Sequence, residues 1–227
     1  MKFDKREAVK VGWEVFKKNW KFLFLVGAIV FIFSSVLNAV VQSMPDSLWP
    51  LSLLIGIFSW ILGITMSIGL LKINVKAVDE EQLRFSDLYS HYRLFFKYLV
   101  AQFLSGMAAL FPSMLLIGGV VLAASNSNTV FIVVGLLLSL IGVLLLIVVS
   151  TRLMFALYFV ADREMGPVDA LRASWSATRG EVVNLILFGL LLFAVVVIGL
   201  LALVVGVFVA IPVTTLATAY VYKKLAS

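Results

Sequence analysis

The chain lacks cysteine, has a single histidine, and carries a charge on only 13% of its 227 residues. Without cysteine, disulfide bonds and thiolate metal sites are excluded. Histidine and acidic residues nowhere have metal-ligand spacing, and the chain contains neither a nucleophile elbow nor a phosphate-binding loop. The single histidine, His91, is interpreted as a solvated side chain. The sequence therefore predicts a protein that is not an enzyme and that uses no cofactor or metal.

The low fraction of charged residues indicates that lipid surrounds much of this chain. A water-soluble domain carries about 25% charged residues because it must cover its surface with them, whereas this chain is 63% hydrophobic. Within a bilayer, only helices and closed barrels pair every backbone group. Barrel strands alternate apolar and polar residues over about ten positions, but residues 22–41 here form one predominantly apolar run. The sequence predicts an all-α polytopic membrane protein, with residues 1–227 as a single transmembrane domain.

Charge-free stretches predict where the chain crosses the membrane. These stretches are residues 22–41, 47–71, 98–151 and 182–222. A helix needs about 20 residues to cross the hydrocarbon core, so the first two give one span each. The third gives two, because residues 124–129 are a cluster of turn formers. The fourth would measure roughly 60 Å as one helix, so we expect two spans with the turn at Gly199 or Gly206. Six spans in three hairpins are predicted.

The distribution of positive charge predicts the orientation. Lysine and arginine accumulate in short cytoplasmic loops. With six spans, all 18 of these residues fall on one side, and Asp46 is the one charged residue on the other. We therefore expect a multi-pass protein of the inner membrane with both termini in the cytoplasm. The basic excess is explained by topology, and nucleic acid is not an expected partner.

Three similar segments precede the odd-numbered spans. Each places an acidic residue five or six positions before an aromatic residue, which is Trp13, Tyr92 or Trp175, and a basic residue four or five positions after it. Their helical periodicity predicts amphipathic helices in the cytoplasmic interface. The chain then consists of three copies of one unit, at 3–78, 85–161 and 167–224. The alternative is that any segment flanking a span has this composition.

The interfacial segments supply candidate lipid-binding residues. Basic side chains near an anionic leaflet each contribute about 1 kcal/mol, and aromatic side chains anchor helices at the headgroup level. The basic candidates are Lys17, Lys18, Arg172 and Arg179, and the aromatic anchors are Trp13, Trp20, Tyr92 and Trp175. Membrane lipids with anionic headgroups are thus the expected partners.

Arg152 differs from the other basic residues because apolar positions surround it on both sides. It either anchors or caps the helix structurally, with its side chain reaching the interface, or binds a lipid or another anionic ligand. We expect the guanidinium to face the bundle interior on the cytoplasmic half and to bond carbonyls, hydroxyls or a lipid phosphate; the alternative is a side chain that reaches the interface as a surface anchor. A charge near the bilayer centre otherwise costs about 2.5 to 3.5 kcal/mol.

The segment from Arg152 to Asp162, followed by Gly166-Pro167, Ser174-Trp175 and Thr178-Arg179-Gly180, carries a family resemblance. It resembles a set of bacterial and archaeal six-helix membrane proteins of unassigned function, which includes the membrane domain attached to some glycerophosphoryl diester phosphodiesterases. Residues 8–20 fit the N-terminal pattern of the same set. The resemblance implies a six-helix membrane fold and gives Arg152 importance, but it implies no activity.

Taken together, these features favour a non-enzymatic membrane protein that interacts with lipids or organises the membrane. The alternative is a pore or carrier for a small solute or lipid, because repeated helix pairs are common among transporters. Against the alternative, no charged or strongly polar stripe runs through the spans. The sequence specifies neither a substrate, nor a protein partner, nor an oligomeric state.

Overall fold

The computed structural model describes residues 3–201 and 203–226. Over these residues the secondary structure is helical, and none of it is strand. Six of the helices are long and apolar enough to cross a membrane, which is what a multi-pass membrane protein requires. The long helices are α1 (Lys5–Ser43), α2 (Trp49–Val78), α3 (Phe95–Ala124), α4 (Thr129–Leu153), α7 (Val182–Leu201) and α8 (Leu203–Ala226). The shorter elements are η1 (Asp46–Leu48), η2 (Phe85–Leu88), η3 (Tyr92–Leu94), α5 (Ala156–Arg163) and α6 (Pro167–Ala177).

The helix ends follow local sequence signals. The Asp4 side chain accepts the Arg6 N–H at 2.7 Å and so begins α1. The predicted turn at residues 124–129 is confirmed, since α3 ends at Ala124 and the Asn128 side chain caps α4 by accepting the Val130 N–H at 2.9 Å. The turn expected at Gly199 or Gly206 lies at neither glycine, because α7 is described to Leu201 and α8 from Leu203; the residue between them is outside the described part of the chain.

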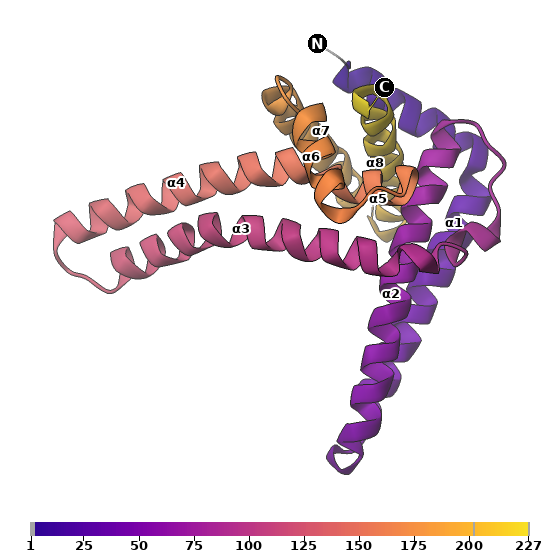
Figure 1. Ribbon diagram of the computed structural model, residues 1–227, viewed down its shortest axis with the longest axis horizontal. Coiled ribbons are helices and arrows are strands. Elements are labelled where there is room, and N and C mark those ends of the chain that lie inside the picture. The colour runs from indigo at the N-terminus through magenta and orange to yellow at the C-terminus, as the bar shows by residue number, and fades with distance from the viewer. Residues whose placement is uncertain (1–2, 202, 227) are drawn as a thin grey trace.

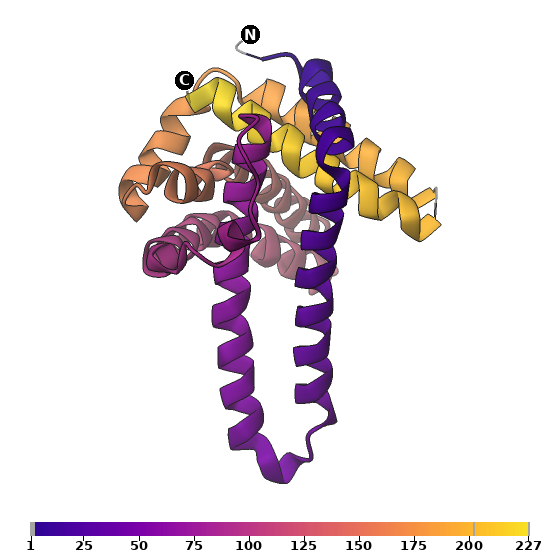
Figure 2. The ribbon, with the colours of Figure 1, turned by 90° about the vertical axis from the view of Figure 1, so that its right-hand side faces the viewer.

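The long helices lie in three antiparallel pairs, α1–α2, α3–α4 and α7–α8. Figure 1 and Figure 2 show that the pairs meet at one end and extend from there in different directions. We call the common end the base; it contains α5, α6, η2, η3 and the helix ends next to them. The opposite ends, with the turns, are the tips. Both chain ends lie at the base (Figure 1).

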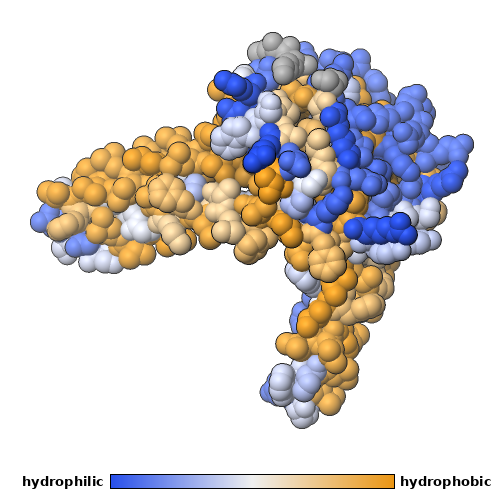
Figure 3. All heavy atoms as spheres, in the orientation of Figure 1, coloured by the Kyte–Doolittle hydropathy of each residue, from blue (hydrophilic) through white to orange (hydrophobic). Residues whose placement is uncertain are grey.

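An aromatic core joins the three pairs at the base. Tyr222 of α8 is buried among three rings, with centroid distances of 6.0 Å to Phe155, 5.1 Å to Tyr158 and 5.1 Å to Phe159. Phe188 of α7 belongs to the same buried cluster. Away from the base, the surfaces of the pairs are apolar and exposed, whereas hydrophilic residues surround the base (Figure 3). This distribution suits helices embedded in lipid and a base in contact with water.

The α3–α4 pair is held closely by glycine. A Cβ added at Gly119 would lie 2.5 Å from the carbonyl oxygen of Gly135, and a Cβ at Gly135 would meet α3 at the same distance. Such small residues let two membrane helices approach until their backbones touch. At the neighbouring Gly118, by contrast, an added Cβ would meet nothing within 4 Å.

The first and third interfacial segments form helices at the base. The first is the part of α1 that precedes Asn19, where non-helical backbone angles interrupt the helix. Its apolar side, with Ala8, Gly12 and Phe16, is buried, and Gly12 packs closely on α8. The third segment is α6, which begins with Pro167 at a position where proline needs no N–H donor.

The second interfacial segment, residues 85–97, is not the single amphipathic helix that its periodicity predicts. It forms the two short 3-10 helices η2 and η3 before α3 begins. Asp87 explains the difference, because its carboxylate accepts the Arg84 backbone N–H at 3.2 Å and pairs with Lys76 Nζ of α2 at 2.8 Å. Leu88 is also packed against Gly69 of α2. These tertiary contacts outweigh the helical pattern, and the triplication remains a prediction.

Candidate functional site

Arg152 lies at a break between two helices that a serine bridges. Helix α4 ends at Leu153 and α5 begins at Ala156. The hydroxyl of Ser174, from α6, donates to the Arg152 carbonyl at 2.7 Å and accepts the Phe155 N–H at 3.2 Å. Thr178 Oγ1 lies 3.5 Å from the same carbonyl and 2.9 Å from the Ser174 carbonyl. Both side chains are fully buried, so they pair backbone groups that the helix break would otherwise leave unpaired.

The guanidinium of Arg152 rests on the end of α6. One of its terminal N–H groups donates to the Trp175 carbonyl at 3.2 Å, and its central carbon lies 5.2 Å from the centroid of the Trp175 ring. Trp175 is in the last turn of α6, where carbonyls lack helical partners and a positive charge is favoured. The carbonyl partner expected from the sequence is therefore present.

Most of the hydrogen-bonding capacity of this guanidinium is unused. Within the described chain, the Trp175 carbonyl is its one hydrogen-bond acceptor, and its Nε is buried without a partner. A guanidinium has a planar set of N–H donors that matches the oxygens of a phosphate or carboxylate. Arg152 thus makes the structural contact that was one of the two expectations. Its Nε is enclosed, so only its terminal N–H groups remain for an anion, and the anion-binding role stays a prediction.

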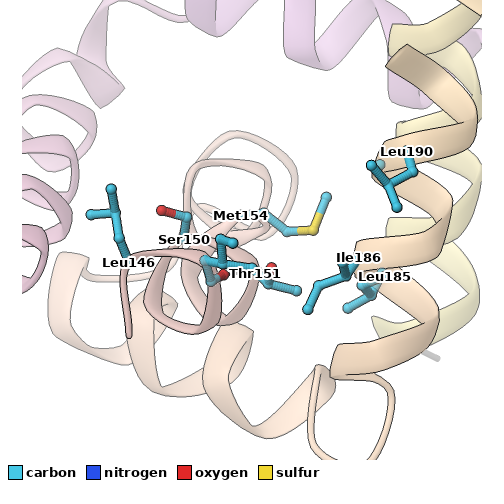
Figure 4. Close-up of a pocket in the computed structure, with 9 residues that line it drawn as sticks. Leu146, Ser150, Thr151, Met154, Leu185, Ile186 and Leu190 are labelled. Carbon is cyan, nitrogen blue, oxygen red and sulfur yellow. Dashed lines mark hydrogen bonds between the residues drawn. The ribbon is translucent and has the colours of Figure 1, made fainter. Parts of the chain in front are cut away.

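A groove runs between α4 and α7 beside this junction. It has a volume of about 460 Å³, and Figure 4 shows its α4 and α7 side chains facing one another across the space. The walls are largely apolar: Leu146, Ile147, Ser150, Thr151, Met154, Leu185, Ile186, Gly189 and Leu190. The Thr151 hydroxyl is already bonded to the Ile147 carbonyl at 2.7 Å. The groove therefore offers a surface for an alkyl chain.

The groove is lined by close neighbours of Arg152 in the chain. Thr151 and Met154, one position before and two positions after Arg152, line the groove, whereas Arg152 itself is not among the lining residues. Gly189 forms part of the α7 wall, and a Cβ added there would meet nothing within 4 Å. Leu190 is 59% exposed, so the groove is open along its side.

The remaining basic candidates lie on two separate elements. Lys17 and Lys18 are exposed on α1, where Lys18 pairs with Glu80 at 3.0 Å and Lys17 lies 5.8 Å from the Trp13 ring centroid. Arg172 is exposed on α6, and Arg179 follows Thr178 in the loop that leads to α7. The structure thus brings Arg152 and Arg179 to the same junction but places the two lysines on α1.

The four aromatic anchors all lie at the base with their rings partly exposed. Trp13 is 44%, Trp20 51%, Tyr92 61% and Trp175 48% exposed. Trp20 has Lys21 Nζ at 5.8 Å from its ring centroid, which resembles the arrangement of Lys17 and Trp13. Pairs of an aromatic ring and a cation suit the boundary between headgroups and hydrocarbon.

Sequence reasoning missed a polar network that joins α2, α5 and α8 at the base. Lys223 pairs with Asp79 at 2.7 Å, and the Tyr222 hydroxyl donates to Asp162 at 3.0 Å. Lys72 Nζ donates to the carbonyls of Ala161 and Asp162 at 3.3 and 3.2 Å. The sequence does contain a signal for this network: Lys72 and Lys223 each directly follow a long charge-free stretch, where a cation needs a partner. Across the described residues, no three His, Cys, Asp or Glu side chains gather to hold a metal ion.

Comparison with protein families, with curated proteins and with solved structures found no match to this chain. The resemblance to six-helix membrane proteins therefore remains a prediction from the sequence.

Proposed function

We propose that this chain is a lipid-binding protein of the inner membrane, in which the α4–α7 groove holds an acyl chain and Arg152 binds an anionic headgroup. The observation that carries the proposal is a guanidinium whose terminal N–H groups make one hydrogen bond to the described chain, beside Thr151 and Met154, which line an open apolar groove. The two features match the two ends of a phospholipid. The protein acts by holding or organising lipid, without chemical conversion.

The distribution of charge supports the orientation that this proposal needs. The described lysine and arginine residues lie at the base, and Asp46 is the charged residue of the α1–α2 tip. By the positive-inside rule the base faces the cytoplasm. The three helix pairs are then transmembrane hairpins, and α6 and the first part of α1 lie in the cytoplasmic interface. Both termini are cytoplasmic.

The site discriminates between headgroups through Arg152. A phosphate oxygen that accepts from the free N–H groups forms charge-assisted hydrogen bonds, which are roughly twice as strong as neutral ones. Arg172 on α6 and Arg179 just after α6 add further positive charge. Each contributes about 1 kcal/mol near an anionic leaflet. A zwitterionic headgroup gains less from this field, because its own cation is repelled. We expect selectivity for anionic phospholipids.

The groove supports a lipid better than a solute in transit. A pore would need a polar path through the bundle, whereas this groove is apolar and opens sideways beside exposed Leu190. An acyl chain that leaves the bilayer to lie on Leu185, Ile186 and Met154 exchanges one apolar surface for another. Its binding energy therefore comes from close packing and from the headgroup contact.

Retained lipid tests the proposal directly. The full chain is purified in a mild detergent after expression, and native mass spectrometry identifies the lipids that stay bound. The Gly189→Leu variant fills the groove, Arg152→Lys removes the planar donor set, and Gly118→Leu is the matched control on an open stretch of α3. We expect anionic phospholipid on the parent and the control, less lipid of every class on Gly189→Leu, and loss of the anionic preference in Arg152→Lys.

Equal amounts and classes of lipid on all four proteins would contradict the proposal. Loss of lipid from Gly118→Leu as well would show that the groove is not the site.

A further inference from the structure

A second cavity, of about 310 Å³, lies where the three helix pairs meet. Its walls come from α1, α2, α3, α5 and α8, and it is separate from the α4–α7 groove, with which it shares no residue. Apolar side chains such as Leu23, Val26 and Ile73 form much of the wall. The volume is near the lower end of the range for small-molecule sites, which is roughly 300–1,000 Å³.

Three polar side chains of this wall are candidates to bond a ligand. Asn74 of α2, Tyr98 of α3 and Tyr158 of α5 form no hydrogen bond to the described part of the chain. The tyrosines are only 6% and 7% exposed. Their hydroxyl oxygens are nevertheless not among the fully enclosed unpaired atoms, which are Ser59 Oγ and Arg152 Nε. The hydroxyls therefore border open space, and a ligand in the cavity can reach them.

The polar groups are uncharged, and so is the rest of the cavity wall. Lys72 lies between two lining residues in the chain, but its ammonium group is directed to the carbonyls of Ala161 and Asp162. A phosphate in the cavity would thus find no cation, and an ammonium group would find no carboxylate. Hydroxyls and an amide can both donate and accept, which suits a neutral group with oxygen atoms.

The cavity opens toward the apolar surface. Gly27 of α1 and Ile211 of α8 line it and are themselves exposed, Ile211 by 51%. Both lie within the apolar stretches of their helices, so the opening faces the hydrocarbon side of the molecule. A ligand that enters here comes from the bilayer and needs an apolar body behind its polar end.

We propose that this cavity binds an uncharged lipid with a hydroxyl- or ester-bearing end, of the monoacylglycerol type. The oxygen atoms of the ligand bond Asn74, Tyr98 and Tyr158, and its alkyl chain leaves between Gly27 and Ile211. This site goes beyond the anionic-lipid site at Arg152, because its location and its ligand class both differ.

The test uses a monoacylglycerol that carries a diazirine on its alkyl chain. The full chain is reconstituted in phosphatidylcholine nanodiscs and irradiated, and the labelled peptides are quantified by mass spectrometry. We expect label on peptides of the cavity wall, displaced by unlabelled monoolein but not by lysophosphatidic acid of the same chain length or by glycerol. Gly27→Leu should reduce this label at least tenfold, because a Cβ at Gly27 meets nothing within 4 Å and the side chain can occupy the opening.

Conservative variants keep the test independent of folding defects. Tyr98→Phe and Tyr158→Phe retain the rings and should each weaken binding by about 2- to 10-fold, as the loss of one hydrogen bond does. Gly189→Leu and Gly118→Leu should leave the label unchanged. The inference is overturned if Gly27→Leu and both phenylalanine variants label like the parent, if lysophosphatidic acid competes as well as monoolein, or if glycerol alone displaces the label.

Discussion

Ser174 holds the backbone of Arg152 in place across 22 positions of the chain, through a hydrogen bond of 2.7 Å from its hydroxyl to the Arg152 carbonyl. The same oxygen accepts the Phe155 N–H, so one buried side chain connects α6 with both sides of the α4–α5 break. Because the Arg152 side chain in turn bonds the Trp175 carbonyl, α6 contacts both the backbone and the side chain of this arginine. The proposed headgroup site therefore depends on the docking of α6.

Replacing Ser174 by alanine should destabilise the protein by about 1 to 3 kcal/mol, because it leaves buried backbone groups without a partner. Thermal unfolding in detergent measures the effect. Ser176→Ala is the matched control, since Ser176 is exposed on the same helix and surface changes stay within about 0.5 kcal/mol. Equal melting temperatures for the two variants would show that the Ser174 bridge does not stabilise the protein.

Two adjacent glycines should differ in how much the same substitution destabilises the protein. Gly119→Leu should destabilise the protein by about 1 to 3 kcal/mol, because the new side chain would collide with the Gly135 backbone. Gly118→Leu should change stability by less than about 0.5 kcal/mol, because its Cβ meets open space. The gain in helix propensity is the same for both. Similar unfolding temperatures would show that α3 and α4 do not pack as described.

Labelling of single introduced cysteines measures the membrane orientation, and a chain without cysteine of its own is well suited to it. A cysteine introduced by Ser127→Cys at the α3–α4 tip should react with an impermeant maleimide added outside intact cells. One introduced by Ser176→Cys at the base should react only after the cells are opened, because the proposed orientation puts the base in the cytoplasm. The reverse pattern would invert the topology, and labelling of both from outside would show that the tips and the base share one side.

The sequence was sufficient for those parts of the fold that local signals determine. The apolar stretches correctly located the long helices, and the turn formers at residues 124–129 correctly located the end of α3 and the beginning of α4. Residues 85–97 could not be predicted in the same way. Their 3-10 helices depend on Asp87 meeting Lys76 of α2, and periodicity contains no information about that contact.

The sequence predicted only part of the candidate site, because the rest depends on contacts between distant segments. The apolar surroundings of Arg152 indicated that its guanidinium needs a partner, and a carbonyl partner is present. The identity of that carbonyl, on Trp175, and the bridge from Ser174 depend on how α6 folds back. The α4–α7 groove was not predictable, because its walls are ordinary apolar residues whose gap arises from the packing of two separate helix pairs.

Location of the bound lipid tests the central claim most directly. Phosphatidylglycerol with a diazirine at the end of its acyl chain is incorporated into nanodiscs with the full chain, and the labelled residues are mapped by mass spectrometry. We predict label on the α4 and α7 residues of the groove, stronger than with the phosphatidylcholine analogue. We also expect it to be weakened at least several-fold by Gly189→Leu and Arg152→Gln but not by Gly118→Leu. Label that is equal for both headgroups, or that persists in Gly189→Leu, would contradict the proposed lipid site.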